Sequence, residues 1–319
     1  MHKKKYVPAH AKPKKKGLLL PILLPILLGF LFLGVFFLAN HADHRAPLPE
    51  KETAAASITP VSSQMVPVLM YHHFQDRNCG DGCVSAKNFE AQMKALHDAG
   101  FHAIRLKDLR DYAEEGTPLP EKPFLITMDD GYTSNLTEAA PILEKYGMHA
   151  AVFVIGINEG EPFYVHTGEP FYSERFSFAE AKPWVDKDVL EIQCHTYDLH
   201  QRAEYGCSGR DGVRKLPEET EEDYRKVLKE DLHAYRVRQQ GKLDGEVYAL
   251  AYPLGYYTET AEAVYREEGI GITFTTDARS NRIEAGNPDS LRLLGRYPIT
   301  DRMTGTDVVN LIADAHGEI

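Results

Sequence analysis

The sequence predicts an α/β fold, a single barrel of parallel strands that is complete or incomplete, behind an N-terminal membrane helix. Short apolar, β-prone runs alternate with segments of helical periodicity, and strands that alternate with helices pair in parallel. No repeat of about 20–50 residues is visible, which argues against a solenoid. A chain of 319 residues suits one large domain after a short targeting region.

The N-terminus has the composition of a membrane anchor. Residues 17–39 contain no charge, and at about 1.5 Å per residue such a helix crosses a hydrocarbon layer of about 30 Å. Pro21 and Pro25 are compatible with it, because the carbonyls they free can be satisfied locally in a membrane helix. The basic segment 1–16 holds seven lysines and no acid, and such flanks stay cytoplasmic. We expect a single-pass protein of the cell membrane with the rest of the chain extracytoplasmic.

A cleaved signal peptide is the alternative, since Ala39, Asn40 and Ala42 resemble a small-residue cleavage site. The apolar stretch exceeds the usual length of about 7–15 residues, which favours an anchor. Residues 40–65 are rich in Ala, Pro, Ser and charge without periodicity, so they are interpreted as an extracytoplasmic linker. Residues 66–319 then form the large domain.

Charge excludes one class of ligand. The formal net charge is −11, and without the seven N-terminal lysines the rest of the chain carries −18. Nucleic acid is therefore not expected as a ligand, because binding phosphates requires a basic face. A neutral or cationic glycan is electrostatically acceptable, and the sequence identifies no protein partner.

Four cysteines, Cys79, Cys83, Cys194 and Cys207, lie in the part expected outside the cell, where disulfides persist. Half of a zinc knuckle is the alternative for Cys79 and Cys83, but no second pair follows at the required spacing. Disulfides that staple loops are favoured, with three pairings open.

The elements of the large domain follow in order. The apolar run 66–71 is the first core strand and ends at His72. Segment 85–100 places three apolar residues on one helical face, with Ser85 as cap and Gly100 as stop. The remaining elements are a strand after Phe101, strand 124–128, helix 139–145, strand 150–155, a helix after Ser177, strand 189–193, helix 218–238, strand 247–252, helix 259–268 and strand 273–275.

Two adjacent carboxylates stand where a core strand ends. Asp129 and Asp130 follow strand 124–128, and Gly131 permits a sharp turn there. In parallel α/β folds the carboxyl ends of the strands form the functional rim. One carboxylate can bind a metal while the other, kept ionised by the cation, accepts a proton from water. An Asp-Gly turn with helix-capping carboxylates is the alternative for these residues alone.

Two histidines follow another strand end. His195 and His200 come after strand 189–193, and neutral imidazole is a good ligand for zinc, cobalt or nickel. Hydrogen-bonded core or surface histidines are the alternative. Joined to an aspartate, the pair makes a two-His, one-Asp site with open positions, as catalytic metals have. Such a metal lowers the pKa of water from about 16 towards 7, which serves amide or ester hydrolysis.

A third turn follows strand 247–252. The Pro and Gly of Ala251-Tyr-Pro-Leu-Gly255 predict a fixed turn whose backbone N–H groups point to the rim. An N–H group there can stabilise the oxyanion that forms during attack on a carbonyl. An ordinary turn between a strand and a helix is the alternative.

These motifs together resemble the NodB-homology polysaccharide deacetylases. The family hallmark Thr-Phe-Asp-Asp-Gly appears as Thr127-Met-Asp-Asp-Gly131, and the segments 68–73, 118–122 and 251–255 support it. The five-residue spacing of the two histidines is similar to that of the biofilm-type deacetylases of poly-β-1,6-N-acetylglucosamine. The likeness covers roughly residues 66–313.

The resemblance implies a distorted (β/α) barrel of about seven parallel strands and a metal-dependent hydrolase. It implies that Asp129 is the general base and that the Leu254 backbone N–H helps to hold the oxyanion. Further residues with implied roles are the metal ligands Asp130, His195 and His200 and the substrate contacts His72, Tyr132 and Tyr252. The implied metal is zinc, with cobalt, nickel or iron as alternatives.

The sequence departs from the family pattern at two places. Ala251 replaces the arginine that begins the third motif in many relatives, and no late Leu-Xaa-Xaa-His segment supplies the usual general acid. His316 lies in a tail where fraying is expected, so His72 or His73 is the better-placed candidate. The arginines Arg292 and Arg296 either orient Asp129 or form surface ion pairs.

The leading hypothesis is removal of acetyl groups from a cell-surface N-acetylglucosamine polymer, with a poly-N-acetylglucosamine-type exopolysaccharide as first substrate. Peptidoglycan and O-acetylated glycans are the alternatives with the same chemistry. A non-catalytic, glycan-binding relic of the same fold is the alternative of another class, motivated by the two departures.

Overall fold

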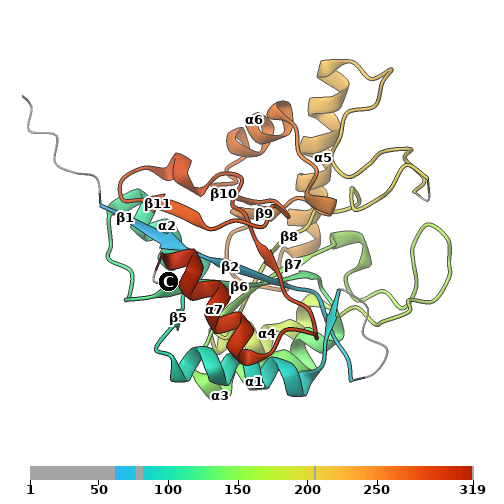
Figure 1. The fold of residues 1–319 in the computed structure, drawn as a ribbon. Coiled ribbons are helices and arrows are strands. Elements are labelled where there is room, and N and C mark those ends of the chain that lie inside the picture. Colours follow the sequence, from blue (N-terminus) through green and yellow to red (C-terminus); the bar gives the residue numbers. More distant parts are fainter. Residues whose placement is uncertain (1–61, 77–81, 205, 318–319) are drawn as a thin grey trace, which may run out of the picture. The chain divides into compact units, whose positions relative to one another are not determined.

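The computed structural model describes residues 62–76, 82–204 and 206–317, which belong to one compact unit, Ile58–Ile319. Its centre is a sheet in which seven neighbouring strands all run parallel (Figure 1). In spatial order they are β10 (Ile272–Phe274), β9 (Ala249–Ala251), β8 (Leu190–Cys194), β7 (Ala150–Val154), β6 (Pro123–Asp130), β2 (Val68–Tyr71) and β12 (Tyr297–Pro298). The predicted sheet of parallel strands is confirmed.

The sheet curves towards a barrel at its last strand. Leu294 forms a parallel bridge with Phe274 of β10, and four residues later Pro298 pairs with Met70 of β2. The segment from Leu294 to Pro298 thus contacts both outer strands of the sheet. The remaining strands are β5 (His102–Ala103), parallel to β6, the antiparallel pair β1 (Ser63–Val66) and β11 (Asn281–Glu284), and the pair β3 (His73–Phe74) and β4 (Cys83–Val84).

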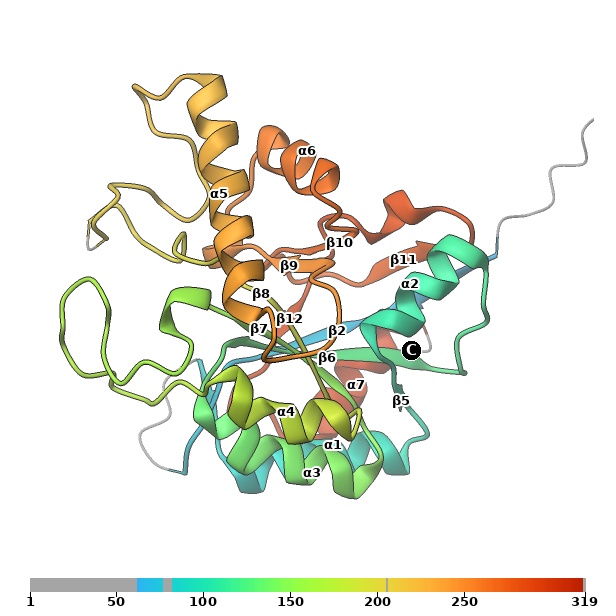
Figure 2. The ribbon, with the colours of Figure 1, turned by 180° about the vertical axis from the view of Figure 1, so that it is seen from behind.

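The helices lie on opposite sides of the sheet. Figures 1 and 2 show α1, α3, α4 and α7 together on one side and α5 and α6 on the other. Their bounds are α1 Ala86–Asp98, α2 Leu106–Glu115, α3 Ala140–Tyr146, α4 Phe178–Asp186, α5 Glu221–Gln239, α6 Glu259–Glu267 and α7 Gly305–His316. Five begin at a hydroxyl side chain that accepts a backbone N–H of the first turn, which satisfies one donor that the helix leaves free. These caps are Ser85, Ser177, Thr220, Thr258 and Thr304.

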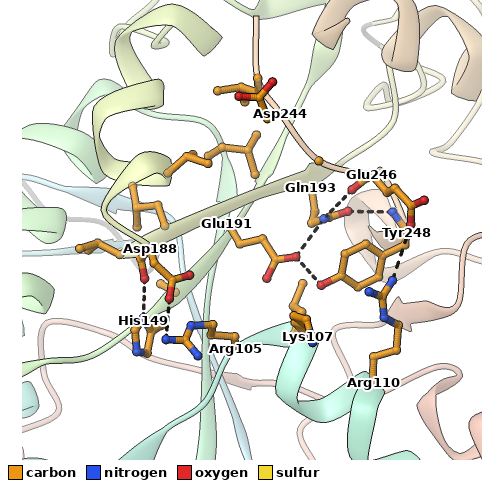
Figure 3. A pocket seen from close by; sticks show the side chains of 18 of the residues that line it. Arg105, Lys107, Arg110, His149, Asp188, Glu191, Gln193, Asp244, Glu246 and Tyr248 are labelled. Carbon is orange, nitrogen blue, oxygen red and sulfur yellow. Dashed lines mark hydrogen bonds and ion pairs between the residues drawn. The ribbon is translucent and has the colours of Figure 1, made fainter. Parts of the chain in front are cut away.

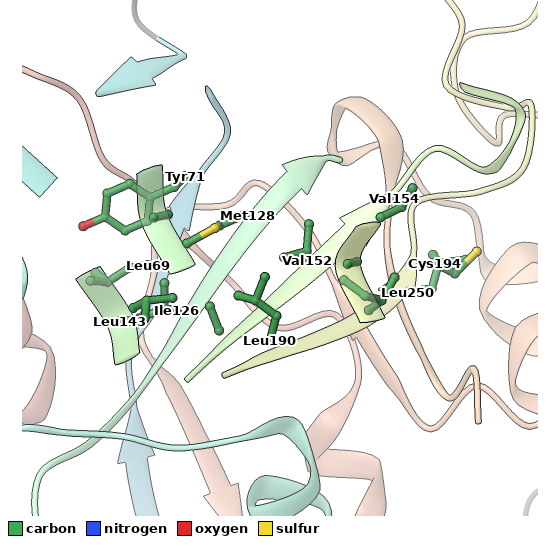
Figure 4. Packing of buried hydrophobic residues seen from close by; sticks show 14 of the residues in the cluster. Leu69, Tyr71, Ile126, Met128, Leu143, Val152, Val154, Leu190, Cys194 and Leu250 are labelled. Carbon is green, nitrogen blue, oxygen red and sulfur yellow. The ribbon is translucent and has the colours of Figure 1, made fainter. Parts of the chain in front are cut away.

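Strand alternation divides the core in two. On β6, Ile126 and Met128 pack in the larger cluster beneath the outer helices, whereas Leu125 belongs to a second cluster with Phe153 and Phe274. Figure 4 shows the larger cluster, to which β2, β7, β8 and β9 also contribute. Successive side chains of a strand point to opposite faces. Odd-numbered residues of β6 therefore face the barrel interior.

The structure corrects several sequence expectations. Pro67 cannot donate to a ladder, so the predicted first strand 66–71 is divided, and β1 already begins at Ser63 in the predicted linker. Helix α2 was not predicted, and the expected fraying tail is helix α7 with His316 as its last residue. No helix in the part of the chain that the structure describes is long and apolar enough to cross a membrane. The predicted transmembrane helix 17–39 lies outside those residues.

Candidate metal and catalytic site

The two carboxylates at the end of β6 point in different directions because of the backbone conformation at Asp130. Asp129 continues the odd-numbered set that faces the barrel interior, and it is 2% exposed. Asp130 has a left-handed backbone with φ 74°, and Gly131 follows with φ 76°. A residue with a side chain rarely adopts this conformation, which redirects the chain sharply. Asp130 thereby points at the histidines that follow β8.

Asp129 is held by a buried arginine. Both oxygens of its carboxylate accept hydrogen bonds from Arg296, at 2.7 Å from Nη1 and 2.8 Å from Nη2. Arg296 is fully buried and also donates through Nε to the Thr275 carbonyl. Burial raises the pKa of Asp129, but the charge of Arg296 outweighs it and holds the pKa below its usual value. The carboxylate is therefore ionised and oriented.

Arg292 has a different role from Arg296. Its guanidinium donates to Glu262 on α6, at 2.8 Å from Nε to Oε2, and to the Ile270 carbonyl. Of the two arginines that the sequence offered for orienting Asp129, the structure thus selects Arg296. The alternative for both arginines was a surface ion pair. Arg296 does not form one, because its side chain is fully buried.

Asp130, His195 and His200 form a cluster that fits a metal ion. Asp130 Oδ1 lies 3.6 Å from His195 Nε2 and 3.4 Å from His200 Nε2. One ligand atom from each of the three residues lies within 4.8 Å of the others. Asp130 Oδ1 is buried without a hydrogen-bond partner, which is unfavourable unless a cation is its partner. Two imidazoles and one carboxylate are the donor set of a catalytic metal with open positions.

The protonation state of His195 suits a metal ligand. Its Nδ1 lies 2.7 Å from the Ala251 carbonyl, and since a carbonyl only accepts, Nδ1 carries the proton and Nε2 is left with a free lone pair. Burial lowers the pKa of His195 to about 4, so the ring is neutral near pH 7. Burial raises the pKa of Asp130, but His200 and then Arg175 lower it well below its usual range. The cluster therefore offers neutral imidazole and ionised carboxylate.

Strained backbone concentrates at this end of the sheet. The described residues contain six side-chain-bearing residues with positive φ, and three of them lie at or just after the ends of β6, β8 and β9: Asp130, Thr196 at 66° and Leu254 at 60°. Leu254 lines the same cavity as Asp130 and His200. Strained residues persist where the surroundings over-determine them, which is common at active sites.

The cavity beside the cluster has a volume of about 460 Å³ and an aromatic wall. Tyr132 lines it, and the guanidinium of Arg175 stacks 3.6 Å above the Tyr132 ring. Arg175 belongs to the 159–176 loop, which also contributes Tyr164 and His166 to the lining. His166 Nε2 lies 2.7 Å from Asp198 Oδ1, which connects this loop to the segment between the two histidine ligands. The sequence predicts Tyr132 as a substrate contact and places substrate choice in loops such as 158–184, but it did not identify Arg175, Tyr164 or His166, because the loop has neither helical nor strand periodicity.

The other predicted residues are placed as follows. His72 Nε2 lies 4.0 Å from Asp129 Oδ2, and its side chain is 32% exposed. His73 turns away and contacts Ser134 and Gln75, each at 2.9 Å. Tyr252 is fully buried and its hydroxyl donates to Glu262 at 2.7 Å, so the prediction that it contacts substrate is wrong for this structure.

The cysteines are partly assigned. Cys83 is disulfide-bonded, whereas Cys194 and Cys207 are free, the first buried and the second exposed. Cys79 lies outside the described residues. The predicted stapling disulfides therefore do not include Cys194 or Cys207.

A second cavity, of about 390 Å³, lies at the opposite ends of the strands (Figure 3). Its lining includes Ala150 and Leu190, the first residues of β7 and β8, and charged residues of α2. Figure 3 shows Glu191 pointing at Tyr248 and Gln193, and both donate hydrogen bonds to it. Arg110 stacks 4.1 Å from the Tyr248 ring centre. Because these polar groups already satisfy one another, the cavity is interpreted as structural.

The chain is similar in sequence to known polysaccharide deacetylases. Residues 116–272 match the family model of polysaccharide deacetylases. The Bacillus subtilis (strain 168) protein YxkH, named as a polysaccharide deacetylase, is 28% identical over 258 residues, covering 81% of this chain and 79% of that protein. The poly-β-1,6-N-acetyl-D-glucosamine N-deacetylase of Staphylococcus aureus (strain MSSA476) is 26% identical over 274 residues, covering 83% and 87%.

A solved structure supports the fold. The de-N-acetylase from Aggregatibacter actinomycetemcomitans superposes with a TM-score of 0.66 at 19% identity, covering 78% of this chain and 100% of that one. The segment matched by the family model contains Asp129, the three clustered residues and Leu254. It contains neither His72 nor Arg296, which reach the site from outside it.

Proposed function

We propose that this chain is a polysaccharide deacetylase and that it hydrolyses the N-acetyl groups of a cell-surface N-acetylglucosamine polymer. The observation that carries the proposal is the pairing of an oriented, ionised Asp129 with the Asp130, His195 and His200 cluster. A poly-β-1,6-N-acetylglucosamine-type exopolysaccharide is the first candidate substrate, because a relative named for that activity aligns over most of both chains. Peptidoglycan and O-acetylated glycans are the alternatives.

The metal proposed for the cluster is zinc, with cobalt, nickel and iron as alternatives. A divalent cation bound there would polarise the acetyl carbonyl and lower the pKa of a water molecule. Asp130, His195 and His200 would hold it, and the Ala251 carbonyl would fix the His195 ring. One carboxylate and two imidazoles are a donor set that supports this role.

The chain's own groups can perform the proton transfers. Asp129 accepts a proton from the attacking water, because Arg296 keeps the carboxylate ionised and aimed into the site. The backbone N–H of Leu254 donates to the oxygen that gains charge during attack. His72 donates a proton to the departing amine, since its Nε2 lies 4.0 Å from Asp129 and its ring reaches solvent. In this scheme His72 fills the general-acid role that the missing late histidine motif left open.

A polymeric substrate suits the wall formed by the 159–176 loop. Phe163, Tyr164 and Val165 are about two-fifths exposed, at 42%, 40% and 43%, and Tyr172 is 82% exposed. Exposed aromatic faces beside a polar cavity can stack against sugar rings next to the one being hydrolysed. We propose that the domain is held outside the cell membrane by residues 17–39, where such polymers are accessible.

A non-catalytic relic is less well supported. That reading was motivated by Ala251 in place of a family arginine and by the absent late histidine. Arg296 supplies a guanidinium to Asp129 from another part of the sequence, and His72 supplies an imidazole at the same carboxylate. Both groups that the relic hypothesis treats as lost therefore have substitutes in the site.

The test is acetate release by the full-length chain in mild detergent. Oligomers of N-acetylglucosamine with β-1,6 or β-1,4 linkage, peptidoglycan and an acetylated xylan would be compared, each with and without a chelator. We expect release from the β-1,6 oligomer that the chelator abolishes and added Zn²⁺ restores. Metal-loaded protein that releases no acetate from any of them would overturn the enzyme proposal and favour the relic.

Two variants test the division of roles. Asp129→Asn should abolish turnover while leaving metal content unchanged, and His200→Ala should lose both. His97→Ala is the matched control, because His97 is an exposed histidine on α1. Loss of metal in Asp129→Asn would show that Asp129 is a ligand rather than the base.

A further inference from the structure

The segment that carries both histidine ligands has an unfavourable backbone. Thr196, directly after His195, has φ 66° and is completely buried. For a β-branched residue the left-handed region is a true outlier, because Cβ lies too close to the following carbonyl oxygen. Such a conformation persists only if surrounding contacts impose it. The structure must therefore contain groups that hold this segment.

One set of contacts comes from the end of β7. The N–H of His195 donates to Val154, and the N–H groups of Gly156 and Ile157 donate to the carbonyls of Thr196 and Tyr197 at 3.0 and 2.8 Å. Gly156 is required there, because a methyl group on it would lie 2.8 Å from the rings of both Tyr197 and Tyr235. These contacts satisfy the carbonyls of Thr196 and Tyr197. The N–H groups of Tyr197 and Asp198 need acceptors from another element.

Helix α5 supplies the opposite set. The two carboxylate oxygens of Asp231 accept the N–H groups of Tyr197 and Asp198, each at 2.8 Å. One turn later, the Tyr235 hydroxyl donates to the Gln193 carbonyl at 2.6 Å. Residues four apart lie on the same face of a helix. One face of α5 therefore forms hydrogen bonds with the chain on both sides of His195, at Gln193 before it and at Tyr197 and Asp198 after it.

The orientation of the His200 ring depends on these hydrogen bonds from α5 more than that of the His195 ring does. The ring of His195 is oriented by the Ala251 carbonyl, but within the described residues no hydrogen bond orients the ring of His200. The direction of His200 is therefore set by the backbone that leads to it. Tyr197 and Asp198, whose N–H groups Asp231 binds, are the residues that precede it.

A carboxylate is a costly choice for this position. Asp231 is 8% exposed, and none of the ion pairs among the described residues includes it. Burial raises the pKa of Asp231 to about 7, even though the two backbone N–H groups lower it. A buried, unpaired acid is retained where its geometry is needed, and strongly perturbed acids cluster at functional sites.

We propose that Asp231 is a positioning residue for the metal site, which fixes His200 relative to His195 and Asp130 through the strained turn between the two ligands. This inference rests on the proposed metal-dependent function. It assigns to α5, outside the motifs, a part in metal binding.

The test measures Co²⁺ binding to the full-length apo chain by visible absorption, which does not depend on turnover. Asp231→Asn keeps the shape but can accept only one of the two N–H groups, so we expect affinity for Co²⁺ to fall about 10–100-fold with a changed spectrum. Tyr235→Phe removes the second contact without changing charge and should weaken binding by about 2–10-fold, even if Asp231→Asn fails to fold. Glu230→Gln is the control, because Glu230 is an exposed acid on the same helix.

The outcomes separate this inference from the proposed function. Wild-type affinity and spectrum in folded Asp231→Asn and in Tyr235→Phe would show a purely structural role and overturn the inference alone. A wild-type chain that binds no Co²⁺ would overturn the metal site and this inference together. Weakened binding in both variants, with Glu230→Gln unchanged, would support positioning.

Discussion

Arg296 contacts Asp129 through two nearly equal hydrogen bonds, of 2.7 and 2.8 Å, in a part of the barrel that excludes solvent. The bidentate geometry leaves the carboxylate one orientation, and guanidinium is the group best suited to impose it. The two residues are 167 positions apart in the sequence. The proposed base is therefore oriented and kept ionised by a residue directly before β12, the last strand of the barrel.

Arg296→Lys tests this preparation. Lysine retains the charge but cannot bridge both oxygens, so about one charged hydrogen bond, on the order of 1.5–3 kcal/mol, is lost. The hydrogen bonds that lower the pKa of Asp129 against the effect of burial are then fewer, so this pKa rises. We expect kcat/KM for acetate release to fall about 10–100-fold and the acid limb of its pH profile to move to higher pH. An acid limb at the wild-type pH would show that Arg296 does not govern the ionisation of Asp129.

Arg292→Lys is the matched control for that experiment. Arg292 pairs with Glu262 and the Ile270 carbonyl, away from Asp129. Its replacement should lower the free energy of unfolding, because a buried ion pair is weakened, yet leave the pH profile in place. The comparison separates loss of stability from loss of orientation.

Periodicity in the sequence predicted most of the fold. Runs such as 150–155 and 189–193 are apolar and β-prone, and the structure has β7 and β8 there. Hydroxyl caps at Ser85 and Ser177 correctly located two helix starts. Helix α2 was missed although Leu106, Leu109, Tyr112 and Ala113 recur at helical spacing and form its buried face. Strands β11 and β12 are defined by pairing with distant strands, which no local pattern reveals.

The candidate site was predicted where its residues follow strands and missed where they come from helices or loops. Asp129 and Asp130 end β6 and His195 directly follows β8, and parallel strands bring their ends together. Asp231 and Arg175 lie on α5 and in a loop, and their contacts depend on three-dimensional packing. Tyr252 shows the converse, since a residue within a rim motif can still point into the core.

Gly255→Ala tests the oxyanion turn. Gly255 has φ 72°, and a methyl group on it would collide with the Thr276 hydroxyl. The turn would have to shift and move the neighbouring Leu254 N–H. We expect an unfolding free energy lower by about 1–3 kcal/mol and a kcat for acetate release reduced about tenfold or more, measured by denaturant unfolding and steady-state kinetics.

The control for this change is Gly271→Ala. Gly271 has no strained φ, and its nearest neighbour to a new methyl group, the Tyr248 carbonyl, is 4.0 Å away. Stability and kcat should both stay near those of the wild type. Equal kcat in Gly255→Ala and the wild type would exclude the Leu254 N–H from oxyanion binding.

Glu191→Gln tests the pH dependence of stability at the second cavity. Burial raises the pKa of Glu191, against the lowering effects of its hydrogen bonds to Tyr248 and Gln193. Between the unfolded and the folded pKa the folded state binds more protons, so stability falls as pH rises through that window. The slope is at most about 1.4 kcal/mol per pH unit for one proton. Urea unfolding at several pH values should show a smaller decline in Glu191→Gln above about pH 4.5.

The exposed carboxylate of the same cavity provides the comparison. Glu246 is 84% exposed and lies 3.8 Å from Arg110. Glu246→Gln should leave the pH dependence of unfolding unchanged. If Glu191→Gln and the wild type lose stability in parallel with rising pH, the buried carboxyl at β8 does not carry the effect.

His72→Gln tests the proposed general acid and its separation from metal binding. His72 approaches the same carboxylate as Arg296 but remains 32% exposed, so it can exchange protons with solvent, unlike buried His195. Loss of a positioned acid lowers kcat by about 10²–10⁴-fold. We expect that loss with unchanged metal content and with the basic limb of the kcat/KM profile removed. His73→Gln is the adjacent control: its ring contacts Ser134 and Gln75 instead of Asp129, so its effect should be on stability. A basic limb that survives in His72→Gln would assign the proton donor elsewhere.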